Sequence, residues 1–262
     1  MISVADHAER SRGFTVVELL TTAGVIVVLC ALLFVAITKA RVKAQSLQCV
    51  SNLLQHGKAL NSFVGDQGKY PLFINPGVQF GLFPDHARSV TEALSTHGLG
   101  APPQNPRDKS SVYLCPRAIR QYESDKHLND FVALYGYNAY GLDGWNAGSL
   151  GLGGSYDDQS QSFAPVVESQ VAAPSRMLAM GDGISGWDRT YQDSSILARS
   201  SRTQDRSGST ERVKMRHDGQ LDDLFCDGHA GSVTLRFLFS DTDDESLSAW
   251  NLDNHPHRER IK

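Results

Sequence analysis

The longest hydrophobic pattern in the chain is an uncharged run close to its N-terminus. Residues 19–37 contain no charged side chain, and residues 14–18 add only one, Glu18. A helix of roughly 24 such residues is about 36 Å long, which exceeds the bilayer core of about 30 Å. The apolar region of a secretory signal peptide is shorter, about 7 to 15 residues, and the TKAR that follows is a weak cleavage site. The run therefore predicts a membrane-spanning helix.

An amphipathic pattern continues directly from this run. Residues 40–64 contain no proline, and apolar positions recur there at spacings near three and four. These positions are Leu47, Val50, Leu54 and Leu60. The GDQG at residues 65–68, followed by Pro71, predicts the end of the helix. We expect one helix of about 50 residues whose outer half needs a sheet to cover its apolar stripe; a membrane helix followed by a separate short helix is the alternative.

Beyond residue 66 the pattern changes to short runs separated by turns. A helical pattern lies near residues 87–96, and strand-like runs follow it. The predicted strands are residues 111–115, 131–137, 176–180, 221–226 and 232–239. Asp227-Gly228, a pair typical of tight hairpin turns, lies between the last two. The sequence thus predicts an α+β fold in which the outer half of the long helix packs on an antiparallel β-sheet.

Two binding functions do not fit the sequence. The glycine-rich GSLGLG at residues 148–153 has no buried strand leading into it and no helix after it, so the context of a dinucleotide site is missing. The formal net charge is -4, and no basic cluster suggests a surface that binds nucleic acid.

The four cysteines allow at most one internal pair in the soluble part. Cys30 lies inside the apolar run, which leaves Cys49, Cys115 and Cys226. Cys49 is on the outer part of the long helix, and Cys115 ends a predicted strand that is able to cover it. We predict a Cys49–Cys115 bridge with Cys226 free; three unpaired thiols packed as small hydrophobic groups are the alternative.

Glu18 is the one charged residue in the apolar segment. A carboxylate in a spanning helix costs up to about 2.5 to 3.5 kcal/mol, and less near the interface. One interpretation is a side chain that reaches the lipid headgroups, and the other is a charge that awaits a partner.

The segment around Glu18 resembles the processing site of type IV prepilins and type II secretion pseudopilins. Residues 12–20, RGFTVVELL, contain the glycine that ends a short polar leader, then Phe-Thr-x-x-Glu-Leu and a long apolar helix. The resemblance implies that a prepilin peptidase cuts after Gly13 and that the new Phe14 amine is methylated. It also implies that Glu18 meets the terminal amine of a neighbouring subunit, where two opposite charges offset each other's burial.

The same resemblance divides the chain and orients it. Basic residues flank both ends of the apolar run, so charge alone does not set the orientation. The resemblance implies a single-pass inner-membrane protein with a cytoplasmic N-terminus and a periplasmic main domain. We expect a leader at residues 1–13, a transmembrane half-helix at 14–38, an amphipathic half at 39–65 and an extracytoplasmic α+β domain at 66–262.

A second motif lies near the C-terminus. His217, Asp227 and Gly228 form the pattern His-x9-Asp-Gly, which resembles the H-X9-DG region of many proteins with prepilin-type N-termini, here residues 211–238. We interpret it as structural: Asp227 caps the turn, Gly228 permits a positive φ, and His217 bonds to the turn. A calcium site, or a catalytic metal held by His217, Asp227 and His229, is the alternative.

These patterns favour assembly over catalysis. The expected function is a structural subunit of a type II secretion pseudopilus or a type IV pilus-like fibre, without catalytic residues or a required cofactor. Its expected partners are a prepilin peptidase and methyltransferase, an inner-membrane assembly platform, the membrane and sister pilin-like subunits. The alternatives are a single-span protein with a non-polymerising ligand- or cargo-binding domain, and a membrane-tethered metal-dependent hydrolase.

Overall fold

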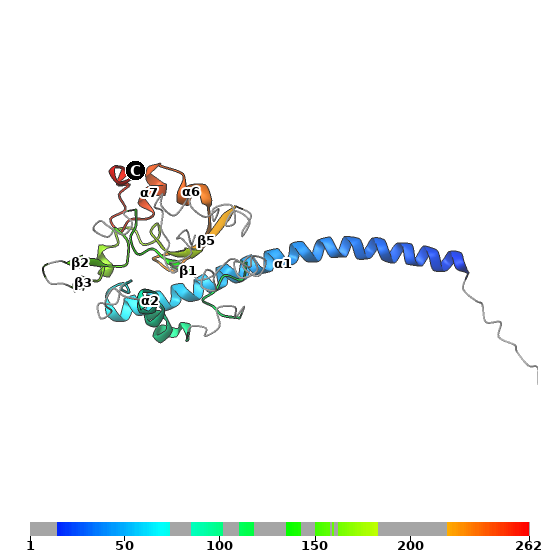
Figure 1. The fold of residues 1–262 in the computed structure, drawn as a ribbon, viewed down its shortest axis with the longest axis horizontal. Coiled ribbons are helices and arrows are strands. Elements are labelled where there is room, and N and C mark those ends of the chain that lie inside the picture. Colours follow the sequence, from blue (N-terminus) through cyan, green and yellow to red (C-terminus); the bar gives the residue numbers. More distant parts are fainter. Residues whose placement is uncertain are drawn as a thin grey trace, which may run out of the picture. The chain divides into compact units, whose positions relative to one another are not determined.

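The computed structural model describes residues 15–73, 85–101, 110–117, 135–142, 150–157, 159, 162–182 and 219–261. The chain divides into two compact units, Met1–Ala44 and Gln45–Lys262. Figure 1 shows the helices and strands of the described residues.

The N-terminal helix α1 is one continuous element, Val16–Gln67, of 52 residues. This confirms the prediction of a single long helix over the alternative of two. The helix ends where the glycine signal predicts, because Gly68 has φ +66 and its N–H donates to the Val64 carbonyl at 2.7 Å. A glycine in this conformation satisfies a terminal carbonyl that the helix itself leaves unpaired.

The main sheet has four antiparallel strands in the order β1-β4-β5-β6. They are β1 (Tyr135–Tyr137), β4 (Leu178–Asp182), β5 (Gln220–Phe225) and β6 (Ala230–Thr234). A separate two-stranded ladder pairs β2 (Ser155–Asp157) with β3 (Ser162–Ala164). A long apolar helix together with an antiparallel sheet gives the α+β layout that the sequence predicts.

Short helices complete the described part of the fold. They are α2 (Asp85–Leu94), the π-helix η1 (Ser95–Leu99), the 3₁₀ turn η3 (Glu168–Gln170), α6 (Leu235–Phe239), α7 (Asp244–Ser248) and the 3₁₀ turn η4 (Arg258–Arg260). The predicted helix near residues 87–96 thus begins slightly earlier, as α2.

Three predicted strands need correction. The strand over 232–239 ends at Thr234, because the Thr234 hydroxyl accepts the Phe237 N–H at 3.1 Å and starts helix α6 there. The strand over 176–180 is displaced by two residues, to Leu178–Asp182. Residues 111–115 form turns instead of a regular strand. Of the predicted strand 131–137, residues 131–134 lie outside the described residues.

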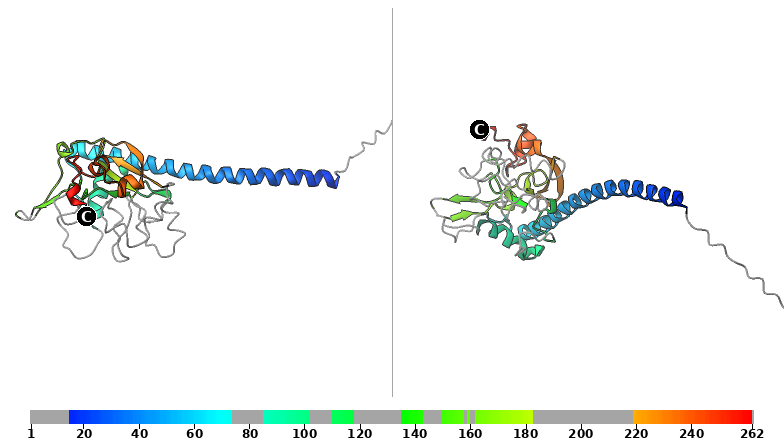
Figure 2. Two further views of the ribbon diagram at one scale, coloured as in Figure 1. Left: turned by 90° about the horizontal axis from the view of Figure 1, so that it is seen from above. Right: turned by 45° about the vertical axis from the view of Figure 1, so that its right-hand side comes forward.

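The core of the second unit consists of two clusters. The larger one joins the buried face of α1, including Leu53 and Leu60, to β1, β4 and residues 113–115. The smaller one lies around the fully buried Trp250, with Leu238 of α6 and Leu247 of α7. Trp250 therefore packs the C-terminal segment into this cluster. Arg258 Nη2 lies 2.7 Å from Asp244 Oδ1, an ion pair between the C-terminal end and α7. Figure 2 shows the marked C-terminus near the orange helices of this part of the chain.

Candidate assembly site

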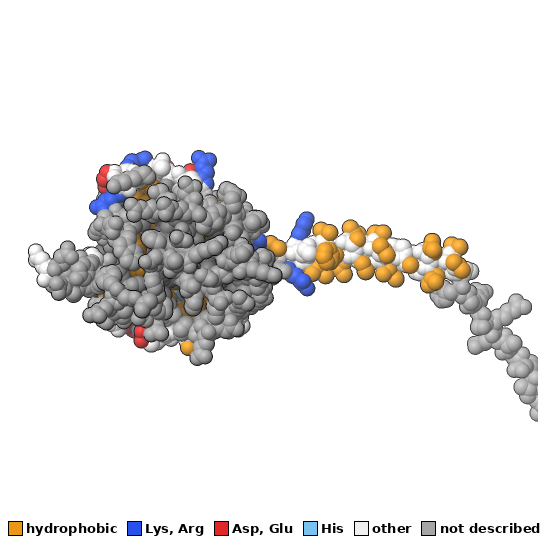
Figure 3. Space-filling model, in the orientation of Figure 1, with side chains coloured by type: hydrophobic (Ala, Val, Ile, Leu, Met, Phe, Trp, Pro, Cys, Tyr) orange, Lys and Arg blue, Asp and Glu red, His pale blue; other side chains and the backbone are white. Residues whose placement is uncertain are grey.

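The first part of α1 exposes hydrophobic side chains all round the helix. Among the described residues, an 18-residue segment of α1 has a mean hydropathy of 2.8, and none of it is buried. By length and composition, this helix is able to cross a membrane. Large side chains such as Leu20, Val27 and Phe34 are more than half exposed. Figure 3 shows these side chains in orange along this stretch, with basic side chains at its end.

The polar side chains within this stretch hydrogen-bond to the helix itself. The Thr21 hydroxyl donates to the Val17 and Glu18 carbonyls at 3.0 Å, and the Thr22 hydroxyl to Glu18 and Leu19 at 2.9 Å. The Thr38 hydroxyl donates to the Val35 carbonyl at 2.8 Å. Lipid offers no hydrogen-bond partner, so such internal bonds lower the cost of placing threonine in a bilayer.

Glu18 has a local partner that sequence reasoning missed. Its carboxylate Oε2 accepts the backbone N–H and the hydroxyl of Thr15, both at 2.8 Å. In return the Glu18 N–H donates to the Thr15 hydroxyl oxygen at 3.2 Å. This reciprocal arrangement is a capping box, and its signal was present in the sequence as Thr15-x-x-Glu18. Glu18 therefore stabilises the start of its own helix, in an exposed position.

The structure does not describe the two residues at the predicted cleavage site. Gly13 and Phe14 lie outside the described residues, so the structure describes only residues 15–20 of the predicted processing segment. Lys39, Arg41 and Lys43 follow the apolar stretch, and all three are exposed. A group of cations at this place suits contact with lipid headgroups.

The second predicted site is the turn between β5 and β6. Gly228 has φ +89, as predicted, and its N–H donates to the Phe225 carbonyl at 2.9 Å. Asp227 Oδ1 accepts the His229 N–H at 3.1 Å and lies 2.5 Å from His229 Nδ1. The His229 ring stacks on Phe225 with centroids 4.3 Å apart. Asp227 thus caps the turn as predicted, while His217 and its expected bond lie outside the described residues.

This turn contacts the second half of α1. Asn61 Nδ2 donates to the Asp227 carbonyl at 3.1 Å. A Cβ on Gly57 would lie 2.7 Å from Leu224 Cδ1 and 2.9 Å from the Gly228 carbonyl oxygen. The absence of a side chain at Gly57 therefore permits the close approach of helix and turn.

The predicted cysteine pair is brought together. Cys49 Sγ and Cys115 Sγ are 3.1 Å apart, and both residues are fully buried. Cys226 is buried elsewhere in the core, and its burial raises the pKa of its thiol to about 12.

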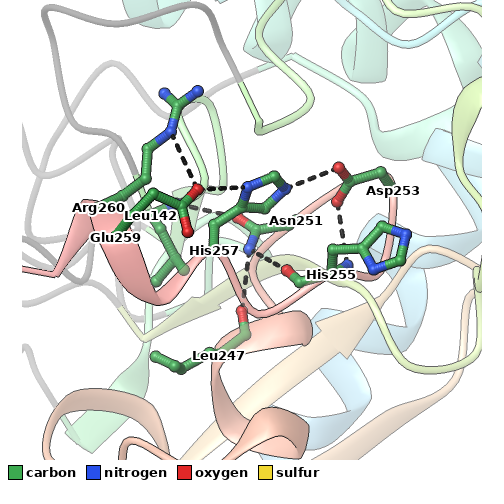
Figure 4. Close-up of polar contacts among 8 residues, drawn as sticks. All are labelled: Leu142, Leu247, Asn251, Asp253, His255, His257, Glu259 and Arg260. Atoms are coloured by element: carbon green, nitrogen blue, oxygen red, sulfur yellow. Dashed lines mark hydrogen bonds and ion pairs between the residues drawn. The ribbon is translucent and has the colours of Figure 1, made fainter.

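Polar side chains of the C-terminal segment form a cluster of hydrogen bonds and ion pairs (Figure 4). The sequence analysis did not predict this cluster. The buried Asn251 accepts the Leu142 N–H at 3.2 Å and donates to the His255 carbonyl at 2.7 Å. His257 Nε2 lies 2.7 Å from Asp253 Oδ2, and its Nδ1 lies 3.1 Å from Glu259 Oε1. Burial opposes the proton on His257, but the bonds to these two carboxylates outweigh it and raise the pKa of His257. The cluster fixes the C-terminal segment to the domain.

Metal binding was the alternative for the turn. Among the residues that the structure describes, no group of three or more His, Cys, Asp or Glu side chains is arranged to hold a metal ion. His217, the first residue of the alternative His217–Asp227–His229 combination, lies outside the described residues.

No protein-family model, curated protein or solved structure matches the chain. The resemblance to prepilins stays a prediction that rests on residues 12–20 and on the spacing of His217, Asp227 and Gly228.

Proposed function

We propose that the chain is a pilin-like structural subunit of a type II secretion pseudopilus or a type IV pilus-like fibre. The observation that carries the proposal is the first part of α1, which is apolar on all sides, uncovered by protein, and has a carboxylate in its first turn. Such a surface needs lipid before assembly, and neighbouring helices supply an equivalent environment in a fibre.

Glu18 has a defined role in this proposal. In the single subunit, Thr15 satisfies the carboxylate at the helix start. Cleavage after Gly13 creates a Phe14 amine, and an amine from a neighbouring subunit is a stronger partner for Glu18 than a neutral hydroxyl. Ammonium and carboxylate buried together offset each other's desolvation, so the pair favours the packed fibre.

The second unit supplies the outer domain. We propose that residues 39–65 pack on the antiparallel sheet as in a pilin. The bond from Asn61 to the Asp227 carbonyl and the close approach of Gly57 to Leu224 support this arrangement. The leader is then cytoplasmic and the domain periplasmic, with a prepilin peptidase and methyltransferase and an inner-membrane platform as partners.

One observation favours a non-polymerising binding domain as the second candidate. A groove of about 810 Å³ lies beside β6, lined by Phe225 and Phe237 together with Arg176, Asp244 and Asn254. A groove with aromatic walls and a few charged groups suits a small ligand or a peptide. This candidate predicts a chain that stays monomeric in the membrane while it binds its ligand.

Crosslinking between subunits in the membrane tests the proposal. Glu18→Ala is expected to insert into the membrane as well as the unchanged chain, because a charge has been removed. It should lose the crosslinks, because the neighbouring amine has no partner. Thr15→Ala is the matched control: it removes the cap but keeps the carboxylate, so the crosslinks should remain. Unchanged crosslinking in Glu18→Ala would show that the proposed pairing is wrong.

A further inference from the structure

Cys49 and Cys115 meet where residues 110–117 lie along α1. Cys115 Sγ is 3.1 Å from Cys49 Sγ. Asn52 Nδ2 donates to the Leu114 carbonyl at 3.1 Å, and His56 Nε2 lies 3.2 Å from the Val112 carbonyl oxygen. The three helix residues follow one another at spacings of three and four, while their partners run in the opposite direction. One face of α1 therefore holds this segment antiparallel to the helix.

Polar contacts fix this approach independently of the sulfur atoms. Asn52 and His56 are 5% and 2% exposed, so their bonds to the segment are made away from water. The Tyr135 hydroxyl donates to the Cys49 carbonyl at 3.3 Å, which adds β1 to the same site. The rings of Tyr113 and Tyr135 both meet His56 edge-on, with centroids 5.4 Å apart. The two thiols thus face each other inside a site that other groups hold in place.

We propose that Cys49 and Cys115 are joined by a disulfide in the mature protein and that Cys226 stays a thiol. A disulfide has a sulfur–sulfur bond of about 2.05 Å, so the two sulfur atoms approach by roughly 1 Å when the bond forms. The bridge clips the segment covalently to the helix and closes a loop of 66 residues. It requires a domain on the oxidising side of the membrane, but not polymerisation.

The two thiols are oxidised by thiol–disulfide exchange. The thiolate of one cysteine attacks the disulfide of an extracytoplasmic thiol oxidase, and one oxidase sulfur leaves as a thiol. The second cysteine then attacks the mixed disulfide. The new bond forms, two protons are released by the cysteines, and two electrons leave with the oxidase, which becomes a dithiol. Because both sulfurs are fully buried in the folded domain, the exchange occurs before residues 110–117 dock on α1.

Alkylation under denaturing conditions tests the bridge on the full chain extracted from membranes. Without a reductant, intact mass should show two alkylated cysteines, Cys30 and Cys226, and after reduction it should show four. Peptide mapping should link the Cys49 peptide to the Cys115 peptide, and Cys226→Ala should keep this link. Four alkylated cysteines without reduction, or a bridge that contains Cys226, would overturn the proposal.

Melting in detergent gives a second readout. Reductant should lower the Tm of the unchanged chain and of Cys226→Ala by roughly 5 to 15 °C. The double variant Cys49→Ala/Cys115→Ala should show no response to reductant, because its bridge is already absent. If the double variant does not fold, the mass measurement on the unchanged chain still decides the question. An equal response in all three chains would contradict the bridge.

Discussion

The two halves of helix α1 share one backbone element but have opposite side-chain surroundings. Between residues 16 and 38 every described residue is exposed, although most are apolar. From Cys49 onward, one face is buried. That face consists of Cys49, Asn52, Leu53, His56, Gly57, Ala59, Leu60 and Val64. The first half thus lacks protein cover on every side, while the second half is covered on one side and exposed on the other.

This difference shows what each half needs in order to be stable. A helix that is apolar all round is stable only in lipid or among other helices. A helix with one apolar stripe is stabilised by a single protein surface. The proposed membrane placement therefore implies a change of solvent along one helix, and Lys39, Arg41 and Lys43 lie between the two halves. The comparison predicts that equivalent substitutions in the two halves have different effects.

Charges placed in the two halves should give the largest contrast. Val27 and Val28 lie near the middle of the apolar half, where each arginine costs about 2.5 to 3.5 kcal/mol in a bilayer. Val27→Arg/Val28→Arg should therefore release the protein from carbonate-washed membranes. Leu47→Arg, at a residue 60% exposed in the second half, is the control and should leave the protein in the membrane fraction. Equal membrane retention of the two variants would refute the difference between the halves.

Truncation of a leucine should lower the free energy of unfolding by different amounts in the two halves. Leu60 is fully buried, so Leu60→Ala should lower the free energy of unfolding of the detergent-solubilised chain by about 2 to 5 kcal/mol. Leu33 is 59% exposed, and Leu33→Ala should change it by less than about 0.5 kcal/mol. Thermal melting measures both. A comparable loss in Leu33→Ala would mean that the first half is covered by protein.

His56 makes the second half sensitive to acid. Burial lowers the pKa of His56 to about 4, although the bond to Val112 opposes the shift. Between the ordinary histidine value and this pKa the unfolded chain binds a proton that the folded chain does not. The contribution of His56 to the free energy of unfolding is therefore fully present above about pH 6.5. It falls by about 1.4 kcal/mol per pH unit toward pH 4. His56→Gln keeps a donor for the Val112 carbonyl but does not titrate, so its stability should fall less steeply. If the free energy of unfolding falls with the same slope in the two chains between pH 6.5 and pH 4, His56 is not the cause of the acid sensitivity.

Glycine substitutions should give a smaller contrast. Gly57→Ala places a methyl group against Leu224 and the Gly228 carbonyl, which should cost about 1 to 3 kcal/mol. Gly24 and Gly65 have open space around them, so alanine there should be neutral or should stabilise the helix by up to about 1 kcal/mol. Chemical denaturation of the three variants measures this. If Gly57→Ala is as stable as Gly65→Ala, the turn does not approach α1 closely.

The sequence predicted best those features of the fold that a strong local signal marks. The uncharged run, the GDQG stop and the Asp227-Gly228 turn each depend on one strong local signal, and each was found in the structure. The strand predicted over 232–239 was partly wrong because Leu235 to Phe239 suit a strand and a buried helix equally well. There the N-cap at Thr234 sets the start of the helix, and a hydrophobic pattern carries no information about caps.

Contacts between distant residues were harder to predict. The approach of Cys49 to Cys115 was predicted, but for an incorrect reason, since residues 111–115 are turns held by Asn52 and His56 and not a strand. The bonds of Asn251 and His257 join residues through backbone carbonyls and turns, so no periodic pattern marks them. Glu18 had the opposite problem, because a local signal for a capping box was present and was not considered.

The mature N-terminus tests the central claim most directly. The protein should be extracted from membranes, and its first residue determined by N-terminal sequencing together with intact mass. The assembly account predicts that the chain begins at Phe14, with one methyl group added to its amine, so that the apolar helix stays in the mature protein. A chain that begins beyond residue 37, or one that keeps residues 1–13, would contradict it.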